Sequence, residues 1–119
     1  MLIGGWDSSK FIGDLKWYPI ILKTSYMIKL DDIKFNGKSS GICPANQGCM
    51  AVVDSGSTGI SFPSKMIKAL SDGGVPFKKY SKKCKKSFEY GTMEFIIGGN
   101  SYPLRHNEWM MRAKKLEWT

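Results

Sequence analysis

A short apolar run that ends in a carboxylate is the most constraining feature of this chain. Residues 51–59 read Ala-Val-Val-Asp-Ser-Gly-Ser-Thr-Gly. Apolar runs bounded by turn-forming residues are typical of buried strands. Asp54 therefore directly follows a strand, within reach of the hydroxyls and backbone N–H groups of the residues after it. This pattern predicts a reactive acid at Asp54, with an acid that only caps the turn as the alternative.

Length and composition limit the size of the fold. The chain has 119 residues, of which 42% are hydrophobic, enough for one domain or one lobe with a modest core. Residues 1–5 lack the basic start and long apolar middle of a signal peptide and resemble the middle of a strand. No apolar run approaches the roughly 18–20 residues that a membrane-spanning helix needs. We therefore expect a fragment of a longer protein, with no membrane span in this chain.

The positive charge is unevenly distributed. The net charge is +8, and six lysines fall in one short stretch: Lys78, Lys79, Lys82, Lys83, Lys85 and Lys86. No nucleic-acid-binding motif or aromatic ladder accompanies them. We therefore expect a solvated loop and no nucleic-acid partner, with docking to an acidic partner as the weaker alternative.

The three cysteines allow two interpretations. Cys43 and Cys49 flank a turn-rich loop, and closing it as a disulfide would imply an oxidising compartment and leave Cys84 over. Zinc is the other possibility, but His106 is the only histidine and the cysteine spacing is not that of paired zinc knuckles. No metal is expected.

The hydrophobic pattern predicts a mostly β chain. Strands are expected at 2–5, 17–22, 26–35, 50–53 and 93–97, with a return strand that begins at 102. Asn36-Gly37 is a strong hairpin signal, and residues 98–101 should form a second turn. A short helix is expected over 63–70, since proline is tolerated in the first turn and Met66, Ile67 and Leu70 share a face.

Several segments together resemble a known family. In order they are 4–8, 13–19, 26–30, 36–37, the 43–49 loop, 51–59, 95–99 and 102–104. They resemble the C-terminal lobe of the pepsin-like aspartic proteases over about residues 1–110, whereas the tail 111–119 does not match. The resemblance implies one lobe of the double-β-barrel acid-protease fold, mostly β with one or two short helices. The lobe is incomplete, because no closing strand of two hydrophobic residues and glycine is found before the chain ends.

The resemblance implies peptide-bond hydrolysis by two aspartates, one from each lobe. Two carboxylates that share a site do not both ionise easily, so one stays protonated in acid. The ionised carboxylate draws a proton from a bound water, and the protonated one donates to the scissile carbonyl oxygen. This is general acid–base chemistry, which needs no cofactor, metal or covalent enzyme intermediate.

Residue roles follow from the same resemblance. Asp54 would be this lobe's catalytic aspartate, with Gly56 N–H and the Ser57 hydroxyl bound to its carboxylate. Ser55 would brace the loop against that of the other lobe. Five residues would contact the extended substrate: Tyr26, Val52, Gly56, Ser57 and Thr58. Tyr26 and Val52 match positions on the leaving-group side of the cleft; their alternative is a plain structural role in the core.

The other half of the site is expected outside this sequence. The resemblance assigns the second aspartate and a flap tyrosine to an N-terminal lobe, and the partner of Cys84 to a position beyond 119. We therefore expect a companion lobe and a peptide or protein substrate as partners, and no activity from residues 1–119 alone. The alternatives are a homodimeric, retroviral-type protease with Asp54 from each subunit, and a non-catalytic peptide-binding module. Paired cysteines and acid chemistry favour the secretory pathway, an acidic vacuole or lysosome, or the cell exterior.

Overall fold

The computed structural model describes residues 2–72 and 91–109. The lysine-rich stretch, Cys84 and the tail 111–119 lie outside this part of the chain. The expectations for those segments therefore stay predictions.

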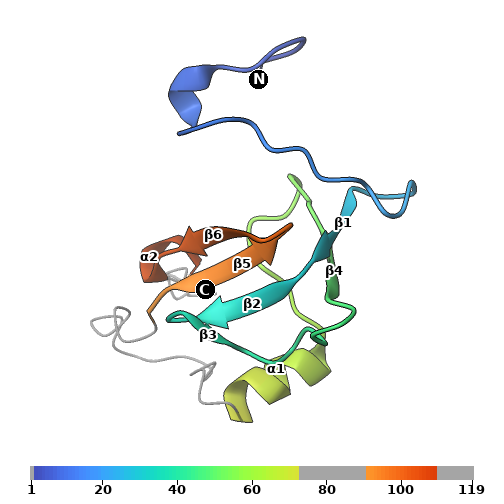
Figure 1. The fold of residues 1–119 in the computed structure, drawn as a ribbon, viewed down its shortest axis with the longest axis vertical. Coiled ribbons are helices and arrows are strands. Elements are labelled where there is room, and N and C mark those ends of the chain that lie inside the picture. Colours follow the sequence, from blue (N-terminus) through green and yellow to red (C-terminus); the bar gives the residue numbers. More distant parts are fainter. Residues whose placement is uncertain (1, 73–90, 110–119) are drawn as a thin grey trace, which may run out of the picture.

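Two antiparallel sheets form the body of the described structure (Figure 1). The first pairs β1 (Met27–Leu30) with β4 (Cys49–Val52). The second has the order β3-β2-β5-β6, built from β2 (Asp32–Phe35), β3 (Lys38–Ser39), β5 (Met93–Ile97) and β6 (Asn100–Leu104). Two short helices, α1 (Ser64–Asp72) and α2 (His106–Trp109), and one 3₁₀ turn at Ser8–Lys10 complete it. The mostly β fold with short helices, expected from the sequence, is confirmed.

Both predicted hairpins are present, and their turns explain why. Asn36 and Gly37 join β2 to β3 with φ of 51° and 78°, and Gly98 and Gly99 join β5 to β6 with φ of 54° and 75°. Paired positive φ values are those of the type I′ turn, whose twist matches that of the strands. Because the second turn uses only two residues, β6 begins at Asn100, two residues before the predicted return strand.

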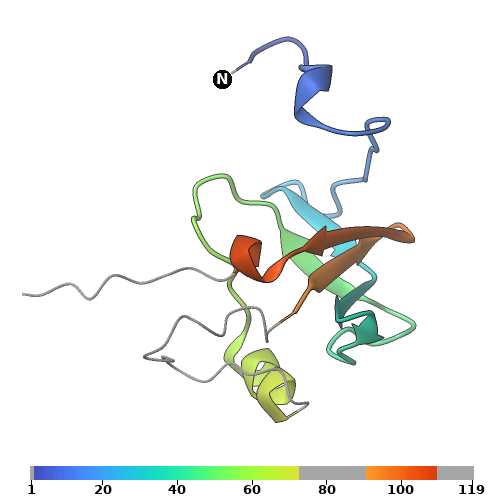
Figure 2. The ribbon, with the colours of Figure 1, turned by 90° about the vertical axis from the view of Figure 1, so that its left-hand side faces the viewer.

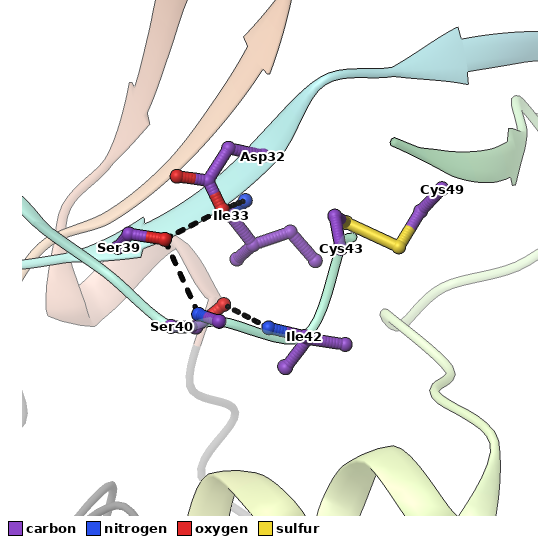
Figure 3. The surroundings of a disulfide bond; sticks show 8 residues. Asp32, Ile33, Ser39, Ser40, Ile42, Cys43 and Cys49 are labelled. Carbon is purple, nitrogen blue, oxygen red and sulfur yellow. Dashed lines mark hydrogen bonds between the residues drawn. A yellow bond between two sulfur atoms is a disulfide. The ribbon is translucent and has the colours of Figure 1, made fainter. Parts of the chain in front are cut away.

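The core lies between the two sheets. Leu30, Ile33, Cys43 and Met93 are buried, at 1–6% exposure, and come from β1, β2, the loop after β3, and β5. The predicted Cys43–Cys49 disulfide is formed, with a Cα–Cα distance of 5.0 Å. It ties the loop to the first residue of β4, and Figure 3 shows it beside Ile33.

The predicted helix at 63–70 is α1, which begins one residue later and reaches Asp72. Pro63 precedes the helix, and its carbonyl accepts hydrogen bonds from the N–H groups of Met66 and Ile67. Leu70 is buried, while Ile67 is 40% exposed. Of the expected apolar face, therefore, Leu70 carries most of the burial.

The predicted strands at 2–5 and 17–22 are wrong. Residues 2–5 form no strand, and the second segment contributes only a single bridge between Leu22 and Met27. Ile3 and Trp17 are 88% and 82% exposed. Figures 1 and 2 both show the first residues apart from the sheets. Apolar sequence makes a segment able to form a strand, but a strand also needs a neighbour for its backbone hydrogen bonds.

Candidate functional site

The Asp54 turn begins where the β1–β4 pairing ends. The last ladder pair is Met27 with Val52, and the N–H of Val53 donates to the carbonyl of Tyr26 over 2.9 Å. Beyond that bond the chain turns, with Ser57 N–H 3.4 Å from the carbonyl oxygen of Asp54. The acid therefore sits at one end of the two-stranded sheet, one residue past a fixed backbone pair.

Each oxygen of the Asp54 carboxylate accepts one hydrogen bond. The N–H of Gly56 donates to Oδ1 over 2.8 Å, and the hydroxyl of Ser57 donates to Oδ2 over 2.7 Å. Both donors lie within three residues of the acid. The turn itself therefore orients the carboxylate.

These donors also change the acidity of Asp54. The Ser57 hydroxyl, and after it the Gly56 N–H, lower the pKa of Asp54 below its ordinary value, with slight opposition from desolvation. Hydrogen bonds to a carboxylate favour its charged form. The Asp54 side chain is exposed, so the ionised group is open to a partner in solution.

The close approach of the Asp54 carboxylate favours glycine at position 56. A Cβ added to Gly56 would lie 3.1 Å from Asp54 Oδ1. A side chain there would press on the oxygen that the backbone N–H of the same residue binds. The sequence of the turn therefore suits the geometry of this bond.

The other predicted site residues lie around the same end of the sheet. Val52 is paired with Met27 in the ladder and is 53% exposed. Tyr26 precedes β1 and is 71% exposed, so it is not packed into the core of the described structure. Ser55 and Thr58 are exposed in the Asp54 turn. The fold thus gathers these positions near the acid, and none of these facts assigns them a role.

Tyr18 contacts the β5–β6 hairpin, and no pattern in the sequence singles it out for that contact. A single tyrosine in an apolar run has no pattern of its own. Its hydroxyl meets that of Tyr102, 84 positions away in the chain. This contact becomes visible only in the tertiary structure, which brings the two distant segments together.

The described residues contain neither a cluster of metal-binding side chains nor a helix able to span a membrane. Within residues 2–72 and 91–109, no three His, Cys, Asp or Glu side chains cluster so as to hold a metal ion. No helix in these ranges has the length and apolar character needed to cross a bilayer.

Known proteins resemble this chain over nearly its whole length. The family model "Eukaryotic aspartyl protease" matches residues 1–117. Cathepsin E of Oryctolagus cuniculus is 36% identical over 107 residues, which cover 87% of this chain and 26% of that protein. Gastricsin of the same species is 28% identical over 117 residues, which cover 95% of this chain and 30% of that protein. Cathepsin E-B of Xenopus laevis is 28% identical over 115 residues, covering 94% and 28%.

The chain thus spans less than a third of the length of these relatives. The match to the family model nevertheless includes both sheets and the Asp54 turn, and it extends to residue 117, beyond the resemblance over about residues 1–110. The resemblance seen in the sequence is confirmed, and the chain belongs to the eukaryotic aspartyl protease family.

Proposed function

We propose that this chain is the C-terminal-lobe part of an aspartic endopeptidase, with Asp54 as one of its two catalytic carboxylates. One observation supports this most directly. In a member of this family, an exposed carboxylate lies two residues past the end of strand β4 and has a hydrogen-bond donor on each oxygen. Donors of this kind keep a carboxylate ionised and fixed in direction, as a general base requires.

The chemistry requires a second carboxylate beside the first. Together the pair would hold one proton, which belongs to the pair rather than to either acid. The ionised form takes a proton from the attacking water, and the remaining proton goes to the carbonyl oxygen of the scissile bond. Gly56 and Ser57 would stabilise the charge on Asp54 during this exchange.

A companion lobe would supply the second carboxylate. Nine exposed large apolar side chains within residues 2–22, upstream of β1, are in keeping with such a lobe, which would bury part of their surface. They are Leu2, Ile3, Trp6, Ile12, Leu15, Trp17, Ile20, Ile21 and Leu22. The 119 residues alone would then be inactive, because they carry one acid of the pair.

The substrate would be an extended peptide that passes the Asp54 turn. Tyr26 and Val52 would contact it on the leaving-group side, and Ser57 and Thr58 through backbone and hydroxyl groups. Ser55 would face the companion lobe and brace the turn. The disulfide and the acid chemistry favour the secretory pathway, an acidic vacuole or lysosome, or secretion.

Asp54→Asn in the complete protein tests the proposal, with Asp14→Asn as the matched control, since both carboxylates are exposed. Hydrolysis of a fluorogenic peptide is measured at mildly acidic pH. We expect Asp54→Asn to reduce kcat at least about 10³-fold and the control to keep full activity.

Each other outcome would indicate a different function for this chain. Full turnover by Asp54→Asn overturns the catalytic role of this residue. A complete wild-type protein that binds peptides without cleaving them is a peptide-binding module. Cleavage by the 119 residues alone, lost in Asp54→Asn, indicates a homodimeric protease.

A further inference from the structure

Tyr18 is the point at which the extended segment between Ser8–Lys10 and β1 attaches to the second sheet. Its side chain is half-buried, whereas residues 12–17 and 19–22 are all exposed. Trp17, its neighbour, is 82% exposed. Tyr18 is therefore the residue through which this stretch contacts the second sheet.

The contacts of Tyr18 come from the β5–β6 hairpin. Its hydroxyl lies 2.6 Å from the Tyr102 hydroxyl and accepts a 3.0 Å hydrogen bond from Asn100 Nδ2. The two tyrosine rings meet edge to face, with centroids 6.3 Å apart. A Cβ on Gly98 would lie 2.7 Å from Cε1 of Tyr18, so the ring rests on the backbone of the hairpin turn. Hydroxyl and ring are thus held by separate contacts.

A short run of backbone contacts connects Tyr18 to the Asp54 turn. The N–H of Ile21 donates to the carbonyl of Met27 over 2.9 Å, and Leu22 forms a bridge with the same residue. The chain reverses between Leu22 and Met27. The carbonyl of Tyr26, at the end of this reversal, accepts a hydrogen bond from the N–H of Val53. Asp54 is the next residue. Positions 18–27 therefore join the β5–β6 hairpin to the acid.

We infer that Tyr18 is a positioning residue, which clamps residues 18–22 to the β5–β6 hairpin and thereby fixes Tyr26 beside Asp54. The clamp rests on the contacts alone. Its consequence for substrate rests on the proposed function, in which Tyr26 faces the peptide. Without the Tyr18 contacts, the chain reversal at 22–26 is left with the backbone contacts of Ile21 and Leu22 to Met27. The hydrogen bond from the Val53 N–H to the Tyr26 carbonyl then opens more often.

Hydrogen exchange of the Val53 amide in the 119-residue chain tests the clamp without any catalysis. Tyr18→Phe removes the hydroxyl contacts and keeps the ring, and Tyr18→Ala removes both. We expect Val53 exchange to rise about 3- to 10-fold in Tyr18→Phe and further in Tyr18→Ala, from the usual net strength of a hydrogen bond. Tyr102→Phe should give a smaller rise.

Two controls separate local release from general destabilisation. Amides of the β2–β5 ladder should exchange at wild-type rates, and Trp17→Phe at the exposed neighbouring position should leave Val53 unchanged. Unchanged Val53 exchange in Tyr18→Ala overturns the clamp. A rise that is equal in the β2–β5 ladder overturns it as well.

Peptide hydrolysis by the complete protein tests the consequence for the site. Tyr18→Phe should raise KM about 3- to 10-fold, with kcat and the pH profile unchanged, because the donors to Asp54 are untouched. Faster Val53 exchange with unchanged KM, or a fall in kcat alone, overturns the role in substrate positioning. If the wild-type complete protein has no activity while Val53 exchange responds, the proposed function fails and the clamp stands.

Discussion

The hydroxyl of Ser57 donates a 2.7 Å hydrogen bond to Oδ2 of Asp54 and is the main reason that the pKa of this acid is lowered. The donor is three residues from the acceptor, so the effect belongs to the turn and requires no other part of the fold. Asp7 and Ser9 form a similar pair near the start of the chain, where Ser9 lowers the pKa of Asp7. The two acids allow a matched comparison.

Ser57→Ala should raise the pKa of Asp54 toward its ordinary value and leave Asp7 unchanged. Ser9→Ala should do the reverse. Carboxyl ¹³C chemical shifts followed by NMR during acid titration of the 119-residue chain measure both. A titration of Asp54 that is identical in wild type and Ser57→Ala would show that the hydroxyl does not stabilise the charge.

The lowered pKa of Asp54 should also make the free energy of unfolding depend on pH. A carboxylate whose pKa is lowered by folding stabilises the fold above its unfolded-state pKa, and this contribution disappears as pH falls through the folded-state pKa. Asp54 is fully exposed, so solvent screening keeps the contribution small. Ser57→Ala should therefore make the midpoint of urea unfolding slightly less sensitive to acidification. A steeper loss of stability in the variant would contradict this assignment.

Gly56→Ala should disturb the Asp54 carboxylate, whereas Gly5→Ala should not. The new methyl group would lie 3.1 Å from Asp54 Oδ1, whereas nothing lies within 4 Å of the same group on Gly5. In the 119-residue chain, the first substitution should raise the pKa of Asp54 and the second should not. In the complete protein, Gly56→Ala should lower kcat/KM about 10- to 100-fold. Equal behaviour of the two variants would mean that the turn accommodates a side chain.

Two methionines provide a test of the core. Met93 is 1% exposed between the sheets, and Met50 on β4 is 71% exposed. Met93→Ala should lower the free energy of unfolding by about 2–5 kcal/mol, because the buried site loses contacts and gains a cavity. Met50→Ala should change it by less than about 0.5 kcal/mol. Urea denaturation measures the free energy of unfolding of both variants. Similar losses of stability in the two would contradict the burial of Met93 in the core.

The disulfide should contribute modestly to stability because its loop is short. Cys43 and Cys49 are six positions apart, and closing so small a loop removes about 2 kcal/mol of unfolded-state entropy in the chain-entropy model. The double variant Cys43→Ala/Cys49→Ala should lower the free energy of unfolding by about that amount. Cys84→Ser is the control, since Cys84 lies outside this bridge. Identical urea midpoints in the double variant and wild type would contradict the contribution.

The features that could be predicted are those whose causes are local. Asn36-Gly37 and Gly98-Gly99 adopt positive φ, so the hairpins follow from the residues themselves. The donors to Asp54 are two and three residues away, so the turn could be foreseen from the sequence. The resemblance then supplied the role proposed for it.

The features that failed, or were not foreseen, depend on distant residues. Residues 17–22 have the composition of a strand, but the described structure gives them only one bridge, at Leu22. The β2–β5 ladder joins residues about 60 positions apart, such as Ile33 and Phe95, and no local pattern specifies that register. The contact of Tyr18 with Tyr102 is of the same kind.

The sequence by itself determined a mostly β chain with an acid in a turn that supplies its own hydrogen-bond donors, because backbone preferences and neighbouring groups act over a few residues. Only the tertiary structure decided which apolar segments became strands, and placed Tyr26 beside the acid. It also made Tyr18 the residue through which the segment before β1 contacts the β5–β6 hairpin. These outcomes require backbone and side-chain surfaces that come together only when distant parts of the chain pack.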